Sequence, residues 1–357
     1  MKIGVFGGSF NPIHKGHINI IKVAIEELEL DKLFIVPTFK SPFKLKNKYI
    51  NDENRVEMIK KVLPPKSEIS LFEINRKCTS FTIDTVRYFK QKFPNDEIFL
   101  IIGSDNVNKL NKWKDIKEIS KLSKITIFKR NNEYSKVNIK KFNCKILNNY
   151  IWPESSSDIR KGQFKHLEKS VHEYISEKQL FLKDINKNIL SIKRHKHSQS
   201  TGYMAAELAK KHEYDPKRAW TAGFMHDITK EWEEEKQRLF LLKYGFEAKD
   251  APSNILHQWT GALWLQEVYK LKDKEIIQAV FRHTTADSFE KNKLTKLDKI
   301  VYIADKLCEG RKYKGINKHR ELAYKDLDKC FDLVSEERQK HYVNEVNKKY
   351  KLTKVKE

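Results

Sequence analysis

The sequence predicts two domains of different classes: an α/β doubly wound parallel sheet at residues 1–183 and an all-helical bundle at residues 184–357. A chain of 357 residues is longer than one hydrophobic core usually organises. In the first half, short apolar runs alternate with amphipathic segments, which indicates a parallel sheet covered by helices on both faces. From about residue 189 nearly every segment has the period of a helix, so the class of fold changes there.

Five apolar runs of the first half are expected to be strands. They cover residues 2–8, 32–38, 69–74, 97–105 and 124–130. Amphipathic helices are expected between them at 14–30, 51–63 and 79–93, where apolar residues recur at helical spacing. In such a sheet, ligands bind beyond the carboxyl ends of the strands, so the loops that leave these ends are the first place to look for a site.

The second half contains a succession of helical segments and almost no strand signal. The clearest helices cover residues 197–212, 216–230, 260–271, 273–283 and 296–310. The segment 181–191 lies between the two patterns and predicts the domain boundary.

Composition narrows the class of ligand. The net charge of +23 is divided between the halves: residues 1–184 carry 35 basic and 22 acidic side chains, and residues 185–357 carry 36 and 26. This even spread favours small polyphosphate substrates over specific nucleic-acid binding. Four scattered cysteines indicate reduced thiols in the cytoplasm, and no apolar run approaches the roughly 20 residues that span a membrane. A homo-oligomer remains open.

The loop after the first strand, GGSFNPIHKGH at 7–17, has the features of a phosphate site. Gly7 and Gly8 allow a ligand to approach the backbone, and the helix that follows offers free N–H groups. His14 and His17 are three residues apart, so they share one face of its first turn. The segment SSSDIR at 155–160 places hydroxyls and an arginine at another helix start, which again suits phosphate.

These segments resemble bacterial nicotinate-nucleotide adenylyltransferases of the H-x-G-H nucleotidyltransferase superfamily, over residues 1–183. The other motifs that carry the resemblance are VPTFKSPFK at 36–44, Arg55, SFTIDT at 80–85, GSDNVNKLNKW at 103–113 and FKR at 128–130. The chain departs from the family at Phe43, where histidine is usual, and at Ser157, where threonine is usual.

The resemblance implies transfer of an adenylyl group from Mg²⁺-ATP to nicotinate mononucleotide, which gives deamido-NAD and pyrophosphate. The implied catalytic residues are His14, His17, Lys44, Ser156 and Arg160. The implied ATP-binding residues are Gly7, Gly8, Ser9, Phe10, His14, His17, Gly103, Asp105, Ser155, Ser156, Ile159 and Arg160. Those for the nicotinate nucleotide are Lys44, Thr82, Asp84, Trp113 and Arg130.

Some of these residues also have a plain structural interpretation. Trp113 has the character of an ordinary half-buried aromatic residue, and Thr82 and Asp84 suit the cap of the helix they begin. Asp105 follows a strand, where aspartate commonly forms a turn.

Histidines and aspartates recur along the helical half. They are His197, His226, Asp227, His257, His283 and Asp305. A single helical histidine is more often packed than bound to a metal, but six such groups on successive helices suit a two-metal centre. Asp227 is expected to bridge the two ions.

This half resembles the HD metal-dependent phosphohydrolase superfamily, through RHKHS at 194–198, LHQWTGA at 256–262, RHTTAD at 282–287 and YIADKLCEGRKYKG at 302–315. Over residues 189–330 it is similar to bacterial symmetrical diadenosine tetraphosphate hydrolases with two iron ions; manganese or cobalt is possible. The resemblance implies that Arg194, Lys230 and Arg311 bind polyphosphate, with Lys230 and Arg311 among the catalytic residues. Gly310 stands where the family has proline. Arg194, Lys230 and Arg311 could each instead be one more exposed cation.

The leading hypothesis is therefore a bifunctional enzyme that acts on ATP, nicotinate mononucleotide and diadenosine tetraphosphate. Three alternatives remain. The first half could serve another acceptor, such as phosphopantetheine or a cytidylyl system. The HD half could act on another nucleotide polyphosphate or an alarmone. The chain could also be a basic RNA-associated protein whose HD half is a sensor module.

Overall fold

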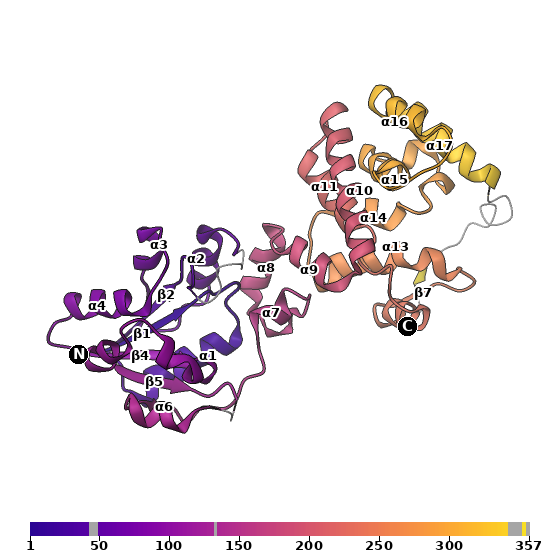
Figure 1. Cartoon of the computed structure of the whole chain (residues 1–357). Helices are drawn as coiled ribbons and strands as arrows, with labels where there is room; N and C mark the ends of the chain where they lie inside the picture. The colour runs from indigo at the N-terminus through magenta and orange to yellow at the C-terminus, as the bar shows by residue number, and fades with distance from the viewer. Residues whose placement is uncertain (43–48, 132–133, 342–351, 355–357) are drawn as a thin grey trace. The chain divides into compact units, whose positions relative to one another are not determined.

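A computed structural model describes residues 1–42, 49–131, 134–341 and 352–354. The chain divides into two compact units, Met1–Ile175 and Ser176–Glu357. Each has its own architecture, sheet-based in the first and helical in the second (Figure 1). The predicted boundary at residues 183 and 184 falls inside helix α9, Leu182–Ile189, and stays a prediction.

The first unit is built on a six-stranded sheet of order β3-β2-β1-β4-β5-β6, in which every neighbouring pair is parallel. The strands are β1 Lys2–Gly8, β2 Lys32–Pro37, β3 Ser67–Ile69, β4 Glu97–Gly103, β5 Lys124–Phe128 and β6 Lys145–Ile146. The strand order reverses between β1 and β4, which defines the position where doubly wound folds bind ligands. The predicted fold class of this half is confirmed.

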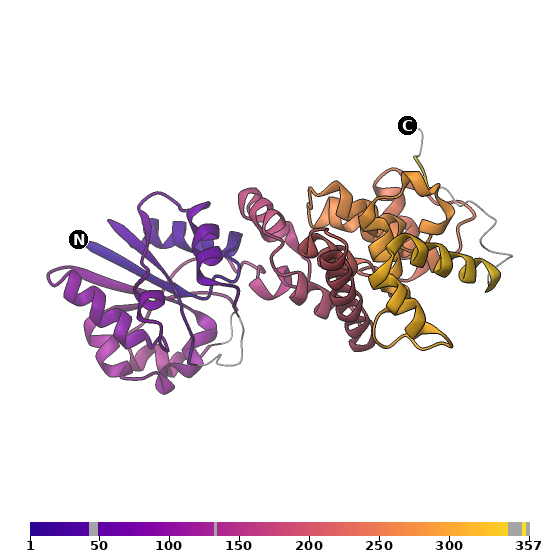
Figure 2. The ribbon, with the colours of Figure 1, turned by 90° about the horizontal axis from the view of Figure 1, so that it is seen from above.

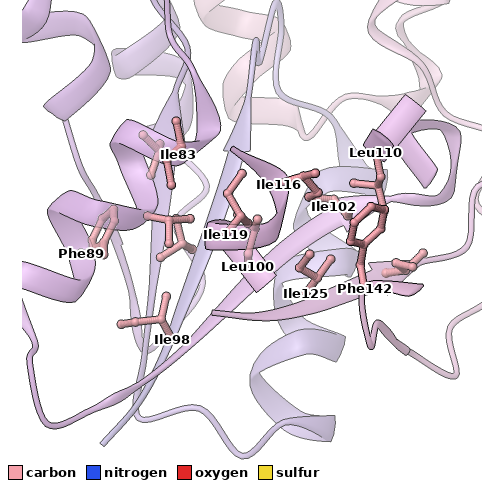
Figure 3. Packing of buried hydrophobic residues seen from close by; sticks show 14 of the residues in the cluster. Ile83, Phe89, Ile98, Leu100, Ile102, Leu110, Ile116, Ile119, Ile125 and Phe142 are labelled. Carbon is pink, nitrogen blue, oxygen red and sulfur yellow. The ribbon is translucent and has the colours of Figure 1, made fainter. Parts of the chain in front are cut away.

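Helices lie on both faces of this sheet (Figure 1 and Figure 2). They are α1 Lys15–Glu27, α2 Asp52–Lys60, α3 Phe72–Arg76, α4 Thr82–Lys92, α5 Ile116–Leu122, α6 Lys136–Lys141 and α7 Ser156–Ile159, with the 3-10 segments η1 Ser104–Lys112 and η2 Phe164–His166. Alternate residues of one strand serve opposite faces. Ile3 and Val5 join a cluster that contains Ile83, Val86 and other side chains of the helices after β3 (Figure 3).

The predicted strand at residues 69–74 is wrong beyond its first residue. β3 ends at Ile69, and the chain turns into the short helix α3. The reason is tertiary: Glu73 is buried and its carboxylate accepts a hydrogen bond from the Thr85 hydroxyl at 2.7 Å. An apolar run of this length does not by itself distinguish a strand from a short helix.

The second unit is helical, as the sequence predicted. Helix α8, Lys169–Glu177, crosses the division. It is followed by α9, α10 Ile192–Lys211, α11 Pro216–Met225, α12 Glu234–Lys243, α13 Ser253–Leu263, α14 Lys274–Arg282, α15 Lys296–Leu307, α16 Ile316–Lys325 and α17 Leu327–His341. The π-helical segment η3, Trp264–Val268, extends α13, and η4 Ala286–Ser288 and η5 Lys291–Lys293 lie before α15. A two-residue antiparallel pair joins β7, Phe246–Glu247, to β8, Thr353–Lys354.

Within the part of the chain that the structure describes, the helices are all too short or too polar to cross a bilayer.

The core of the first unit gives a prediction about stability. Phe89 is fully buried and its ring packs against Phe34 at 5.0 Å between centroids. Phe89→Ala should lower the free energy of unfolding of this unit by about 3–5 kcal/mol, because it leaves a cavity between α4 and the sheet. Hydrogen exchange of the β1 and β4 peptides measures the loss. Val137→Ala, at a residue 73% exposed, is the control and should exchange as the wild type does.

Candidate functional sites

The loop that leaves β1 is shaped by its glycines and by a cis peptide bond between Asn11 and Pro12. A Cβ on Gly7 would meet no atom of the described residues within 4 Å, so these residues leave space beside it. A Cβ on Gly8 would lie 2.9 Å from the ring of Phe10, so this glycine admits a packed aromatic ring. The two predicted glycines thus act differently, and Gly7 is the one beside which a ligand has room.

His14 and His17 lie together at the start of α1, with ring centroids 3.7 Å apart, and both are buried. The backbone N–H of His14 donates to Nδ1 of His17 at 3.3 Å, which leaves Nε2 of His17 to carry its proton. Neither ring nitrogen of His14 has a hydrogen-bond partner among the described residues. Burial lowers the pKa of His14 to about 3 and that of His17 well below its usual value, so both rings are neutral hydrogen-bond donors at pH 7.

Helix α7 brings the predicted serines and arginine to the same loop, although the contacts join residues 144 and 149 positions apart in sequence. The Ser156 hydroxyl donates to the Pro12 carbonyl at 2.8 Å, and Arg160 donates to the Asn11 carbonyl at 2.5 Å. Ser155 caps the helix by accepting from the N–H of Asp158 at 3.1 Å, and Ile159 is fully buried beneath it. The second phosphate-type motif therefore lies against the first.

Arg55 is a supporting residue to which the sequence analysis assigned no role. Its guanidinium is fully buried, donates to the Ser9 carbonyl at 2.7 Å and pairs with Asp52. A buried arginine needs such partners, because an unpaired buried charge is costly. Arg55 thereby fixes the position of the loop at Ser9. Its place in the quoted family motifs was the available signal.

At the end of β4, Gly103 and Asp105 occupy the other side of the strand-order reversal. A Cβ on Gly103 would lie 2.3 Å from the Asp105 carboxylate, so only glycine fits beside it. Arg130 follows β5, and its Nη1 lies 3.9 Å from the Asp105 carboxylate. Ser104 fixes this turn by accepting from the N–H of Arg130 at 3.0 Å.

The structure describes only some of the residues predicted to bind the nicotinate nucleotide. Asp84, in the first turn of α4, pairs with Arg76 at 2.9 Å, and Thr82 begins the same helix. Trp113 packs on the core that Figure 3 shows, while its Nε1 has no partner among the described residues. Lys44 and Phe43 lie outside the described residues.

In the second unit, three predicted ligands meet at one point. Nε2 of His197 lies 3.0 Å from Oδ1 of Asp305 and 3.2 Å from Nε2 of His226. These side chains come from α10, from the residue that ends α11 and from α15, and their ligand atoms lie within 4.8 Å of one another. We call them the first ligand group.

The remaining ligands form a second group beside it. Nε2 of His257, from α13, lies 3.1 Å from Nε2 of His283, which ends α14. Asp227 lies between the groups and turns one oxygen to each. Its Oδ2 is 3.3 Å from His226, and its Oδ1 is 3.3 Å from His257 and 3.8 Å from His283. This is the arrangement expected of a bridging carboxylate.

The cluster suits divalent cations. Ligand atoms bound to one ion at about 2.0–2.2 Å lie roughly 3 to 3.5 Å apart. Most of the distances between the ligand atoms here fall near this range. The Nδ1 atoms of His226 and His283 face the carbonyls of Gly223 and Val280 at 2.6 and 2.7 Å, so the Nε2 atoms hold lone pairs. The facing Nε2 atoms lie only 3.1–3.2 Å apart, so either a proton or a cation has to lie between them. The HD domain and this donor set indicate divalent-metal binding.

Charge compensation is visible in the pKa values. Burial works against the ionised form of Asp227, but His226 and His283 hold its pKa well below the usual range. Burial also disfavours protonated His226, yet the carboxylates of Asp227 and Asp305 outweigh burial and raise the pKa of His226 to about 10. Positive charge is therefore drawn to this point of the fold.

The three predicted polyphosphate-binding cations each contact a ligand. Arg194 donates to Oδ2 of Asp227 at 2.7 Å, and Arg311 pairs with Oδ1 of Asp305 at 2.9 Å. Lys230 lies 3.1 Å from Nδ1 of His257 and donates to the Asn254 carbonyl, and burial lowers its pKa. They surround the cluster rather than projecting freely into solvent.

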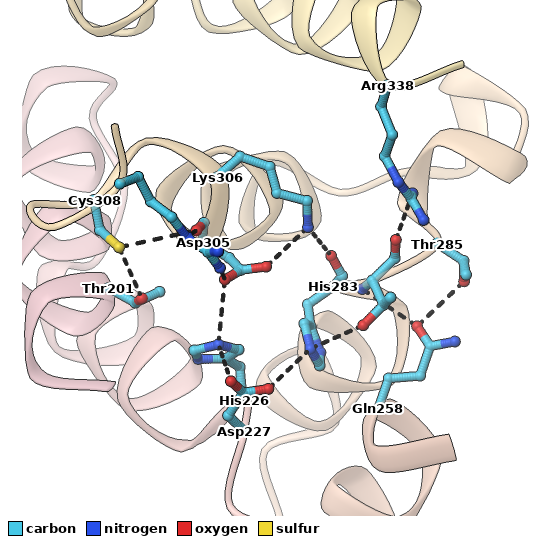
Figure 4. A network of polar contacts seen from close by, with 12 residues as sticks. Thr201, His226, Asp227, Gln258, His283, Thr285, Asp305, Lys306, Cys308 and Arg338 are labelled. Atoms are coloured by element: carbon cyan, nitrogen blue, oxygen red, sulfur yellow. Dashed lines mark hydrogen bonds and ion pairs between the residues drawn. The ribbon is translucent and has the colours of Figure 1, made fainter. Parts of the chain in front are cut away.

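Sequence reasoning missed three polar side chains that touch the ligands. The Thr284 hydroxyl lies 3.2 Å from Nε2 of His257 and 3.0 Å from Nε2 of His283. Lys306 pairs with Asp305 at 2.9 Å (Figure 4), and the thiol of Cys308 lies 3.5 Å from Nδ1 of His197. Each directly follows a predicted ligand or lies three residues beyond one, and this spacing could have identified them in the sequence.

Comparison with known proteins agrees with this division. Residues 5–162 match a family described as cytidylyltransferase-like, and residues 194–310 match the HD domain. A structure titled as a predicted HD superfamily hydrolase involved in NAD metabolism, from Clostridium acetobutylicum, is 30% identical. It covers 46% of this chain and 86% of its own, with a TM-score of 0.43. The two family matches show that the chain combines a nucleotidyltransferase-type unit with an HD-type unit.

Two relatives share both units. A Mycoplasma pneumoniae protein is 32% identical over 92% of this chain and 97% of its own length. A Mycoplasma genitalium protein is 34% identical over 87% of this chain and 88% of its own. Both carry the name "Probable nicotinate-nucleotide adenylyltransferase/Ap4A hydrolase". The chain belongs to this two-domain family.

The shared position of Asp227 gives a testable result. Asp227→Asn should bring the number of tightly bound Mn²⁺ ions below two, because the amide removes the negative charge that both ligand groups share. Metal content after gel filtration measures the loss. Asp250→Asn, at an exposed turn, should retain the wild-type content. Full metal content in Asp227→Asn would contradict the bridging role.

Proposed function

We propose that the chain is a bifunctional enzyme. Its first unit transfers the adenylyl group of ATP to nicotinate mononucleotide, and its second hydrolyses diadenosine tetraphosphate symmetrically to two molecules of ADP. The observation that carries the proposal is that each half of the family name has its own site here: the His14–His17 loop in one unit and the His/Asp cluster in the other.

In the first reaction, a phosphate oxygen of nicotinate mononucleotide attacks the α-phosphorus of ATP. The bond from the α-phosphorus to the bridging oxygen breaks, and pyrophosphate leaves with that oxygen. The nucleophile is already anionic, so the site needs no strong base and must align two polyanions. His17 would donate from Nε2 to the departing phosphates, while His14, Ser156 and Arg160 would hold the triphosphate.

The acceptor would bind residues at the start of α4 and in the segments that follow β4 and β5. Trp113 would stack on the pyridine ring, and Thr82, Asp84, Arg130 and Lys44 would bind the rest of the nucleotide. Nε1 of Trp113 has no acceptor within the described part of the chain, which supports a ligand at this place, because buried indole N–H groups usually have an acceptor. Mg²⁺ would accompany ATP.

In the second reaction, water attacks a central phosphorus of the tetraphosphate, and the bridging bond breaks to leave ADP on each side. When bound, two cations supply charge to polarise the phosphoryl group and to activate the water. Arg194, Lys230 and Arg311 would turn from Asp227, His257 and Asp305 toward the substrate phosphates. We propose iron here, with manganese or cobalt as alternatives, because histidine and carboxylate donors suit all three.

The cytoplasm is the proposed location. All four cysteines are free thiols, as expected where glutathione and thioredoxin keep the compartment reducing.

The test uses the full chain with two assays. With ATP and nicotinate mononucleotide it should form deamido-NAD and pyrophosphate; with Fe²⁺ under anaerobic conditions it should convert diadenosine tetraphosphate to ADP alone. His14→Ala should slow only the first reaction, by about a hundredfold or more, and Asp227→Asn only the second. AMP plus ATP as products would contradict symmetrical cleavage.

The alternatives predict other outcomes. Transfer to phosphopantetheine, or use of CTP, would overturn the proposed acceptor. Turnover of another nucleotide polyphosphate or an alarmone, but not of diadenosine tetraphosphate, would reassign the HD half. RNA binding that weakens steeply with salt and is unchanged by His226→Ala would favour the sensor module.

A further inference from the structure

The turn that carries the ligand His283 is held by a helix outside the HD domain. The HD match ends at residue 310, whereas α17 begins at Leu327. Arg338 of α17 donates from Nη1 to the Thr284 carbonyl at 2.6 Å and to the Asp287 carboxylate at 2.7 Å. Figure 4 shows this guanidinium reaching the segment beside His283.

The end of α14 explains why such a contact matters. His283 is the residue after the last helical position, and the final carbonyls of a helix have no partner within it. Lys306 donates to the His283 carbonyl at 3.1 Å, and Arg338 donates to the Thr284 carbonyl. Both are cations at the negative end of a helix dipole, which is a favourable place for them.

The other side of the turn is held as well. The Gln258 side chain accepts from the N–H of Thr284 at 3.3 Å and from the Thr285 hydroxyl at 3.2 Å. The imidazole of His283 is held through Nδ1 by the Val280 carbonyl. Among the described contacts, the side chain outside the HD match that holds the backbone of the turn is Arg338. Its partner Asp287 has a side chain only 1% exposed.

We propose that Arg338 is a positioning residue of the metal centre. It holds the 283–287 turn so that His283 and the Thr284 hydroxyl face His257, the other histidine of the second group. The HD domain alone is then incomplete, and α17 is part of its working structure. This inference rests on the proposed metal-dependent function of the second unit.

The structure offers a matched control on the same helix. Asp332 of α17 pairs with Lys291 at 2.6 Å. This pair also ties α17 to the segment before α15, but it contacts none of the ligand residues among the described contacts. Lys291→Met therefore removes one charged tie of the same helix without touching the turn.

The experiment measures Mn²⁺ binding to the metal-depleted full chain by calorimetry. The wild type should bind two ions. In Arg338→Met the Kd of one ion should rise about ten- to a hundredfold, which is the usual effect of removing a residue that holds a metal ligand in place. The Kd of the other ion should stay unchanged. Arg338→Lys should recover part of the affinity, because an ammonium reaches one of the two acceptors. Lys291→Met should match the wild type.

Thermal unfolding in EDTA separates positioning from general destabilisation, since no metal contributes there. An unchanged Kd for both ions in Arg338→Met would overturn the inference. So would an equal loss of both ions together with a lower Tm in EDTA, which would mean simple unfolding. A wild type that binds no second ion would instead defeat the proposed metal function, and the inference with it.

Discussion

A buried carboxylate loses several kcal/mol of solvation unless positive charge surrounds it, and Asp227 is such a group. Its two oxygens face the imidazoles of His197 and His226 on one side and of His257 and His283 on the other, which come from four separate places in the helical unit. Arg194 adds a guanidinium at 2.7 Å. The helices of this unit therefore have to converge on one point, and the ligand geometry, the raised pKa of His226 and the surrounding cations all follow from that requirement.

The site of the first unit differs in charge from the site of the second. Its proposed ligand is a polyanion, and His14 and His17 offer that ligand neutral donors, while the charged Arg55 and Arg160 hold the loop. Burial keeps His14 and His17 uncharged, and the loop is held through its own carbonyls by Ser156, Arg160 and Arg55. The rigid loop means that little reorganisation is needed when phosphate arrives.

Much of both sites could be predicted because their chemistry lies in compact motifs. The H-x-G-H loop, the SSSDIR segment and the His-Asp pair each place reactive side chains within a turn of helix, where spacing alone defines the face. The structure joins the first two through contacts across more than 140 residues. The strand expected at 69–74 failed because a buried Glu73–Thr85 hydrogen bond, invisible in the local pattern, favours a helix there.

The sequence by itself determined the two classes of fold, the candidate ligands and the phosphate loop, because these depend on local periodicity and residue type. Only the tertiary structure decided which oxygen of Asp227 faces which histidines, that Gly8 accommodates Phe10, and that Arg338 of α17 holds the turn after His283. Such pairings join residues far apart in the chain. They depend on how the helices pack, and a local pattern of residues does not determine which distant residues meet.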